Sequence, residues 1–165
     1  MEIVRAVTSD LPFIMSTERI PGYENFIGRW DESKHQIALA DEGNAYFVAR
    51  QGKDAVGFTI VEEWDSPKRV THIKRVAVVH PNQGHGRRLV SGVLDAIFQQ
   101  TNAHRIWLGV FPANLRAQHT YAAIGFQAEG IARGLVFNGS EFVDQMVMAI
   151  LRPDWEAGRQ SAPAR

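Results

Sequence analysis

The amino-acid sequence predicts a single α/β domain of the mixed α+β type, with a central mixed, mostly antiparallel sheet and helices on both faces. Two observations predict this fold class. An apolar strand at 70–79 leads through a glycine loop into an amphipathic helix and then into a second apolar strand at 105–111. Such a crossover is right-handed and makes its two strands parallel. The remaining strands are joined by short turns, which are typical of antiparallel pairs.

Composition excludes several classes of protein. The chain has 165 residues, of which 45% are hydrophobic and 22% charged, enough for one packed core. Its formal net charge is zero, so we do not expect the basic surface of a nucleic-acid-binding protein. There is no cysteine, which excludes disulfides and thiol catalysis. No stretch resembles a signal peptide or a membrane span, so we expect a cytoplasmic protein without membrane partners.

Caps, periodicity and turn residues predict the elements of the N-terminal half. They are a strand, a helix opened by the cap cluster Thr8, Ser9 and Asp10, a stretch of helical spacing, a second helix and a strand hairpin. In this order they cover 3–7, 10–19, 23–30, 33–40, 45–50 and 54–64. The aromatic residues of 23–30 belong either to the core or to the wall of an acceptor pocket.

The strand at 70–79 has an irregular apolar pattern. Ile73 and Val76 are an odd number of residues apart, whereas Val76 and Val78 are an even number apart. In a regular strand all three side chains cannot share one face, because alternate residues point to opposite faces. A β-bulge near Lys74 and Arg75 resolves the conflict.

The C-terminal half continues with a helix from the glycine loop to about Gln100 and an apolar central strand at 105–111. Asn114 as N-cap and Gly125 after the last turn bound one short helix. Two antiparallel strands, 127–137 and 141–151, flank the Asn138-Gly139 turn. We expect the domain to cover 1–152 and the Pro- and Gly-containing residues 153–165 to form a flexible tail.

Gly84 and Gly86 lie between a strand and the start of a helix, where unpaired N–H groups and the helix dipole favour an anion. Arg87 and Arg88 add positive charge in the first helical turn, where acidic residues are usual. The third glycine of a dinucleotide-binding loop is replaced by Leu89, and no Walker sequence occurs. The ligand should therefore carry phosphate without belonging to either of those classes, unless the two glycines only form a turn.

These residues resemble the GNAT superfamily of acetyl-CoA-dependent N-acyltransferases. The resemblance rests on the strand end with Val76 and Val78, on Gly84-x-Gly86 with Leu89, and on a second motif. That motif, N-x-x-A-x-x-x-Y-x-x-x-G-F, consists of Asn114, Ala117, Tyr121, Gly125 and Phe126. The match runs continuously over 70–137, and its detail is similar to the branch that acetylates protein N-termini and related small amines.

The resemblance implies how acetyl-CoA would bind. Its pyrophosphate would lie on the main-chain N–H groups from Gln83 to Arg88, and its pantetheine arm would pair with the strand and with Asn114. A bulge that splays this strand from 105–111 would open the slot. The implied cofactor-binding residues are Val76, Ala77, Val78, Gln83, Gly84, His85, Gly86, Arg87, Arg88, Asn114, Ala117 and Tyr121. Pro81 departs from the family, which usually has Arg or Gln at that position.

By the same resemblance, an acceptor amine attacks the thioester directly in a ternary complex. Tyr121 would give the departing thiolate its proton, and a strand N–H such as that of Val78 would polarise the carbonyl. The general base would be His72, or Glu62 or Glu63 directly or through water. An α-amine with a pKa of about 8 has little need of a base, whereas a lysine near 10.4 does. The six histidines show no paired-ligand spacing, so no metal is expected.

Other functions fit the same residues. The domain could be a catalytically idle acyl-CoA sensor, a transferase for another acyl group or for a hydroxyl acceptor, or a nucleotide-binding protein without CoA. The acceptor itself, a small-molecule amine or a peptide N-terminus, has no signature in the sequence. A homodimer is the common state of soluble oligomers, and no patch in the sequence decides the question.

Overall fold

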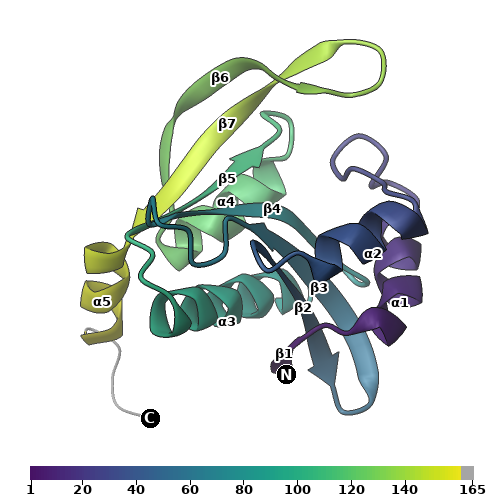
Figure 1. The fold of residues 1–165 in the computed structure, drawn as a ribbon. Coiled ribbons are helices and arrows are strands. Elements are labelled where there is room, and N and C mark those ends of the chain that lie inside the picture. Colours follow the sequence, from purple (N-terminus) through teal and green to yellow (C-terminus); the bar gives the residue numbers. More distant parts are fainter. Residues whose placement is uncertain (161–165) are drawn as a thin grey trace.

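The computed structural model describes residues 1–160 and shows one mixed sheet of seven strands (Figure 1). The strand order is β1-β2-β3-β4-β5-β7-β6, and every neighbouring pair except β4 and β5 is antiparallel. The strands are β1 (Glu2–Arg5), β2 (Asn44–Gln51), β3 (Asp54–Glu62), β4 (Val70–Val78), β5 (Arg105–Val110), β6 (Gln127–Phe137) and β7 (Phe142–Leu151). The predicted fold class is confirmed.

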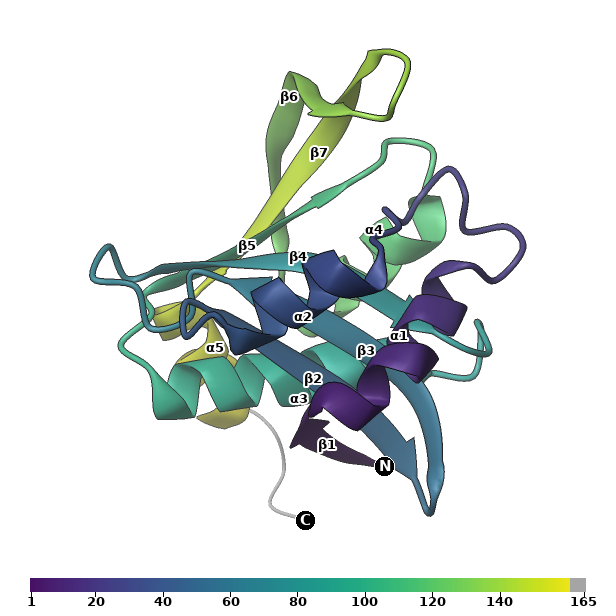
Figure 2. The same ribbon diagram turned by 45° about the vertical axis from the view of Figure 1, so that its right-hand side comes forward.

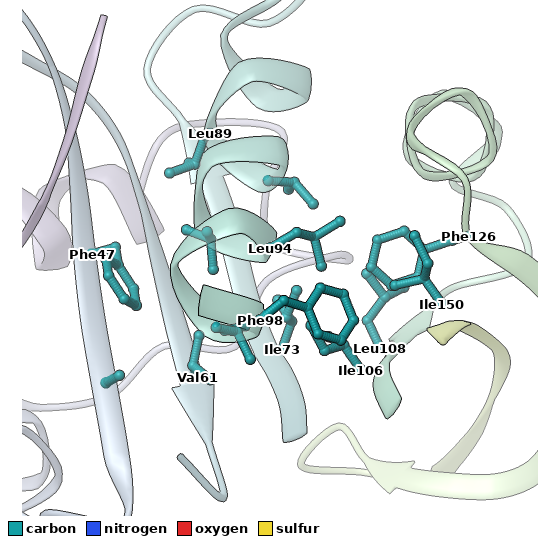
Figure 3. Packing of buried hydrophobic residues seen from close by; sticks show 14 of the residues in the cluster. Phe47, Val61, Ile73, Leu89, Leu94, Phe98, Ile106, Leu108, Phe126 and Ile150 are labelled. Carbon is teal, nitrogen blue, oxygen red and sulfur yellow. The ribbon is translucent and has the colours of Figure 1, made fainter. Parts of the chain in front are cut away.

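Helices cover both faces of the sheet (Figure 2). They are the 3-10 turn η1 (Thr8–Asp10), α1 (Leu11–Glu18), α2 (Glu32–Ala40), α3 (His85–Gln100), α4 (Leu115–Ile124) and α5 (Arg152–Gln160). One core lies under α1 and α2, and a larger one lies under α3 and α4. Figure 3 shows the larger core, in which Leu89, Leu94 and Phe98 of α3 pack against the sheet. No helix within residues 1–160 is long and apolar enough to cross a membrane.

The predicted bulge is present in β4. Ile60 of β3 pairs with Arg75, but the next residue, Val61, pairs with Ile73, so Lys74 is the extra residue. The parallel pairing of β4 with β5 ends close by, at His72. Because a bulge bends its strand and increases its twist, the two strands diverge beyond this point.

Two predictions about local structure are wrong. Residues 23–30 form turns and not a helix, because their apolar side chains are used separately and not as one stripe. Tyr23, for example, is buried and donates a hydrogen bond from its hydroxyl to the Val78 carbonyl at 2.7 Å.

The predicted flexible tail is helical over its first part. In α5, the Trp155 ring packs 5.0 Å from that of Phe98, and its indole N–H donates to Asp95 at 2.9 Å. Arg152, which donates to the Phe98 carbonyl at 2.7 Å, and Arg159, which pairs with Asp95 at 3.0 Å, also hold the segment on α3. The Pro and Gly content of the segment conceals this docking. Residues 161–165 of the predicted tail lie outside the described residues.

Candidate active site

The divergence of β4 and β5 leaves main-chain groups facing a gap. Antiparallel pairing alternates between residues that bond to the neighbouring strand and residues that face away from it. Val79 donates its N–H to Val56 of the β3 side at 2.9 Å, so alternation turns the main-chain groups of Val78 and Val76 away from β3. The Tyr23 hydroxyl on the Val78 carbonyl agrees with this direction. The strand therefore presents an edge to which an extended ligand can add.

A cavity of about 220 Å³ occupies this gap. It is lined by both diverging strands, the glycine loop, α4, the segment before α2, and one residue of β7. The predicted cofactor-binding residues that line it are Val76, Ala77, Val78, Gly84, Gly86, Arg87, Asn114, Ala117 and Tyr121. Gln83, His85 and Arg88 do not line the cavity, and neither do the predicted bases His72, Glu62 and Glu63.

The glycine loop ends the cavity at the N-terminus of α3. Gly84 precedes the helix with φ 75°, a conformation that costs a side-chain-bearing residue about 1–2 kcal/mol. Arg88 donates its N–H to the Gly84 carbonyl at 3.1 Å and so closes the first helical turn. The N–H groups that a helix leaves unpaired therefore end at Arg87, one residue before the predicted limit. His85 is turned inward and buried, so only its main chain is available at the loop.

Tyr121 extends from α4 into the other side of the cavity. Burial raises the pKa of its phenol to about 12, so the side chain is a neutral hydrogen-bond donor at physiological pH. Its ring lies 5.9 Å from that of Phe126, which anchors it to the larger core. Asn114 caps the same helix by accepting the Ala117 N–H at 3.2 Å, so the cap role considered for Asn114 is confirmed.

Two of the three candidate bases, His72 and Glu62, form a pair where β4 and β5 still touch. The His72 ring stacks on Trp107 with 4.0 Å between ring centroids, and its Nδ1 lies 3.0 Å from a Glu62 carboxylate oxygen. Lys74 lies 3.4 Å from the other oxygen. The hydrogen bond from His72, followed by the charge of Lys74, holds the pKa of Glu62 below its usual value. This pair is linked to the cavity through Lys74, which lines it.

A buried ion pair on the α1 and α2 side is absent from the sequence-based predictions. Arg75, next to the bulge, forms a salt bridge with the fully buried Glu18 and stacks over the Trp30 ring at 4.6 Å. Glu18 also lies 3.2 Å from His35 and accepts the Trp30 N–H at 3.3 Å. At Gly28 a Cβ atom would stand 2.7 Å from the Arg75 guanidinium. The segment before α2 is thus fixed to β4 through these contacts.

Gln145 of β7 is a second residue that sequence reasoning missed. Its side chain reaches across Gly109 of β5, where a Cβ atom would stand 2.0 Å from the amide oxygen, and it lines the cavity. A side chain at position 109 would displace it. The only signal in the sequence is the glycine in the middle of an apolar strand, which marks a close approach.

A mixed sheet opened between its one parallel strand pair, with a helix N-terminus at one end of the opening, defines an acyltransferase-type α/β fold. The chain belongs to the Acetyltransferase (GNAT) family, whose pattern matches residues 11–126. The predicted family is confirmed.

Curated relatives match part of the chain. The probable N-acetyltransferase YjcK of Bacillus subtilis is 39% identical over 77 residues, which are 47% of this chain and 42% of the relative. The spermidine N(1)-acetyltransferase of Vibrio cholerae is 34% identical over 77 residues, 47% of this chain and 44% of the relative. The chain spans less than half the length of these relatives.

The fold is shared over nearly the whole chain with a solved structure. The spermidine N-acetyltransferase of Vibrio cholerae, in complex with CoA and spermine, superposes with a TM-score of 0.82. The alignment covers 94% of this chain and 97% of that one at 22% sequence identity. At this identity the similarity establishes the fold alone.

Proposed function

We propose that the protein is an N-acetyltransferase that moves the acetyl group of acetyl-CoA directly to a primary amine in a ternary complex. The observation that carries this proposal is the splayed strand pair. Val76 and Val78 line a cavity between the diverging strands, and the glycine loop and Tyr121 line it as well. Membership of the GNAT family and the N-acetyltransferase names of the relatives support it.

The cavity suits the parts of acetyl-CoA in turn. The pantetheine amides would add to the β4 edge as a further strand, and the pyrophosphate would accept N–H groups at the start of α3 beside Arg87. The CoA complex of the Vibrio cholerae structure supports this cofactor. We propose no metal for the reaction.

Transfer of the acetyl group requires a neutral amine, a polarised carbonyl and a proton for the departing sulfur. The amine nitrogen forms a bond to the acetyl carbon, and the bond from that carbon to sulfur breaks. A β4 N–H such as that of Val78 would stabilise the charge on the carbonyl oxygen. Tyr121 would protonate the thiolate, because its raised pKa keeps the phenol proton in place at neutral pH.

His72 and Glu62 would act on the amine proton through water, since neither lines the cavity. Their hydrogen bond orients the imidazole and keeps Glu62 ionised. For an α-amine with a pKa of about 8, a useful neutral fraction exists near pH 7.5 without them. The predicted cytoplasmic location and homodimer stay predictions.

A thermal-shift comparison of acetyl-CoA, CoA, ATP and NAD tests the cofactor. At about a hundred times Kd, selective binding to the folded protein adds about 2.7 kcal/mol, which is roughly 5–10 °C for a domain of this size. We expect that shift with the two CoA ligands only, followed by amine-dependent thiol release from acetyl-CoA. An equal shift with ATP supports the nucleotide-binding alternative, and CoA binding without turnover of any acceptor supports the sensor alternative.

A further inference from the structure

The cavity reaches both faces of the sheet. Ala117 and Tyr121 of α4 line it and pack against the larger core, whereas Tyr23 lines it and belongs to the core under α1 and α2. In the proposed function Tyr121 serves the departing sulfur, so α4 and this side chain occupy one face at the thioester. An acceptor amine must therefore reach the acetyl carbon from the other face, which carries α1 and α2.

Gln145 of β7 lies on that other face. Gly109 of β5 pairs with Val147, and paired residues of neighbouring antiparallel strands share a face. Gln145 is two residues from Val147 and therefore shares this face too. Met148, of the opposite phase, belongs to the larger core under α3. The Gln145 side chain, which lines the cavity, is thus on the side from which the amine comes.

Room for the Gln145 carboxamide exists because residue 109 is glycine. A Cβ atom at Gly109 would collide with the carboxamide oxygen, and its three nearest atoms would all belong to Gln145. Trp107, two residues from Gly109 in β5, lies on the same face and stacks on His72. The carboxamide therefore lies on the side of the sheet that also holds this candidate base.

Three other neutral polar side chains of the cavity wall already have partners. The Tyr23 hydroxyl donates to the end of β4, Asn114 caps α4, and the Thr120 hydroxyl donates to the main chain of its own helix. Within residues 1–160 no group hydrogen-bonds to the Gln145 carboxamide. A ligand in the cavity therefore meets it as a free donor and acceptor.

We propose, on the basis of the proposed function, that Gln145 binds the acceptor and that its carboxamide oxygen accepts an N–H of the attacking amine. A neutral primary amine has two N–H groups and one lone pair. Only one proton is lost in the transfer, so the other N–H can stay in this hydrogen bond while the lone pair points to the acetyl carbon. Gln145 then fixes the direction of attack.

The lack of charge on Gln145 suits a neutral amine. A carboxylate at this position would favour the ammonium form of the acceptor, which has no free lone pair. Lys74 and Arg75 line the cavity from β4, but each is paired with a glutamate outside it. Within the described residues, 1–160, no aspartate or glutamate lines the cavity. The acceptor nitrogen therefore meets a neutral hydrogen-bond acceptor at Gln145.

Steady-state kinetics of Gln145→Ala test the proposal. Thiol release from acetyl-CoA is measured with glycinamide, benzylamine and spermidine as acceptors. For the amine that the wild type uses best, we expect kcat/KM to fall about tenfold, as for loss of one hydrogen bond, and KM for acetyl-CoA to stay nearly unchanged. Gln127→Ala, exposed on β6 outside the cavity, is the matched control and should change neither. An unchanged kcat/KM for the amine, or a loss carried by KM for acetyl-CoA, overturns the proposal.

Gly109→Ala sharpens the experiment, because it displaces the same carboxamide without removing it. We expect this variant to lose about as much kcat/KM for the amine as Gln145→Ala, and the double variant to lose no more than either one. Losses that multiply in the double variant contradict the proposal.

The wild-type protein distinguishes this proposal from the proposed function. Thiol release with at least one amine supports the transferase function whatever the Gln145 variants do. Binding of CoA without thiol release with any of the three amines overturns the transferase function, and the role of Gln145 with it.

Discussion

The two halves of the cavity are built from different kinds of groups. The half at the glycine loop and β4 offers main-chain N–H and C=O groups, placed by Gly84 and by the Lys74 bulge. The half formed by the segment before α2 offers side chains, and a buried ion pair between Glu18 and Arg75 holds that segment in place. Main-chain sites bind what every cofactor molecule has in common, whereas side-chain sites can differ between enzymes of one fold.

The largest expected effect is on the rate of acetyl transfer, and it does not belong to one half of the cavity alone. Tyr121→Phe removes the proposed proton donor while keeping the ring in its core contact with Phe126. We expect kcat to fall about 10²–10³-fold, with KM for acetyl-CoA nearly unchanged. Steady-state kinetics measure this, with Leu115→Ala on the exposed side of the same helix as the control. Unchanged kcat would remove Tyr121 from the mechanism.

The next effect is on stability, and it compares the buried ion pair of the side-chain half with an ion pair on the surface. Arg75→Met removes the buried guanidinium partner of Glu18 and leaves only the more exposed Arg19 guanidinium, at 3.6 Å. This should cost about 3–5 kcal/mol and lower Tm by roughly 6–20 °C. Arg105→Met removes a pair with Glu129 that is exposed to solvent, and such pairs contribute about 0–1 kcal/mol. Thermal or chemical denaturation compares the two variants. Equal losses of stability would mean that the buried Glu18 pair contributes no more to the free energy of unfolding than the exposed pair does.

A smaller effect is expected in the main-chain half of the cavity. Gly84→Ala places a side chain at φ 75°, at a cost of about 1–2 kcal/mol, although nothing lies within 4 Å of the new Cβ atom. We expect a slightly lower Tm and weaker CoA binding, because relief of the strain moves the N–H groups of the loop. Gly158→Ala in α5, which also meets nothing within 4 Å, serves as the control and should leave CoA affinity intact.

The smallest effect is in the pH profile. The Tyr121 pKa of about 12 means that kcat should not decline between pH 8 and 10 through loss of the phenol proton. Because the pKa of Glu62 is lowered, its stabilising contribution is present above about 4.5 and is lost as the pH falls through its folded value. The acidic limb of kcat/KM should therefore follow the pKa of the acceptor amine. A limb that keeps one pKa with amines of different basicity would contradict this expectation and assign the limb to a group of the protein.

Sequence predicted the main-chain half in detail and the side-chain half hardly at all. The slip in phase between Ile73 and Val76 located the bulge, because a period of two residues leaves no other regular solution. Gly84 and Asn114 indicated where α3 and α4 begin, since few residues can replace them there. These features depend on neighbours in the sequence, so one chain without comparison is enough to see them.

Glu18, in contrast, has partners on β4 and α2, far along the chain. Nothing beside it in the sequence indicates that it is buried. The aromatics of 23–30 have helical spacing by coincidence, because each is drawn to a separate contact with the sheet or the cavity. The helix α5 shows the same limit, because Trp155, Arg152 and Arg159 dock it onto residues far back along the chain in spite of its polar composition.

One additional residue in β4 keeps the sheet from being continuous. Lys74 has no partner in β3, and strand pairing with β5 stops two residues before it. Removing that residue would bring Ile73 and Arg75 into regular alternation and let β4 and β5 pair further along their length. The opening for an elongated ligand thus depends on the number of residues in β4 and not on any one side chain. Deletion of a single codon should therefore disturb the opening more than most substitutions do.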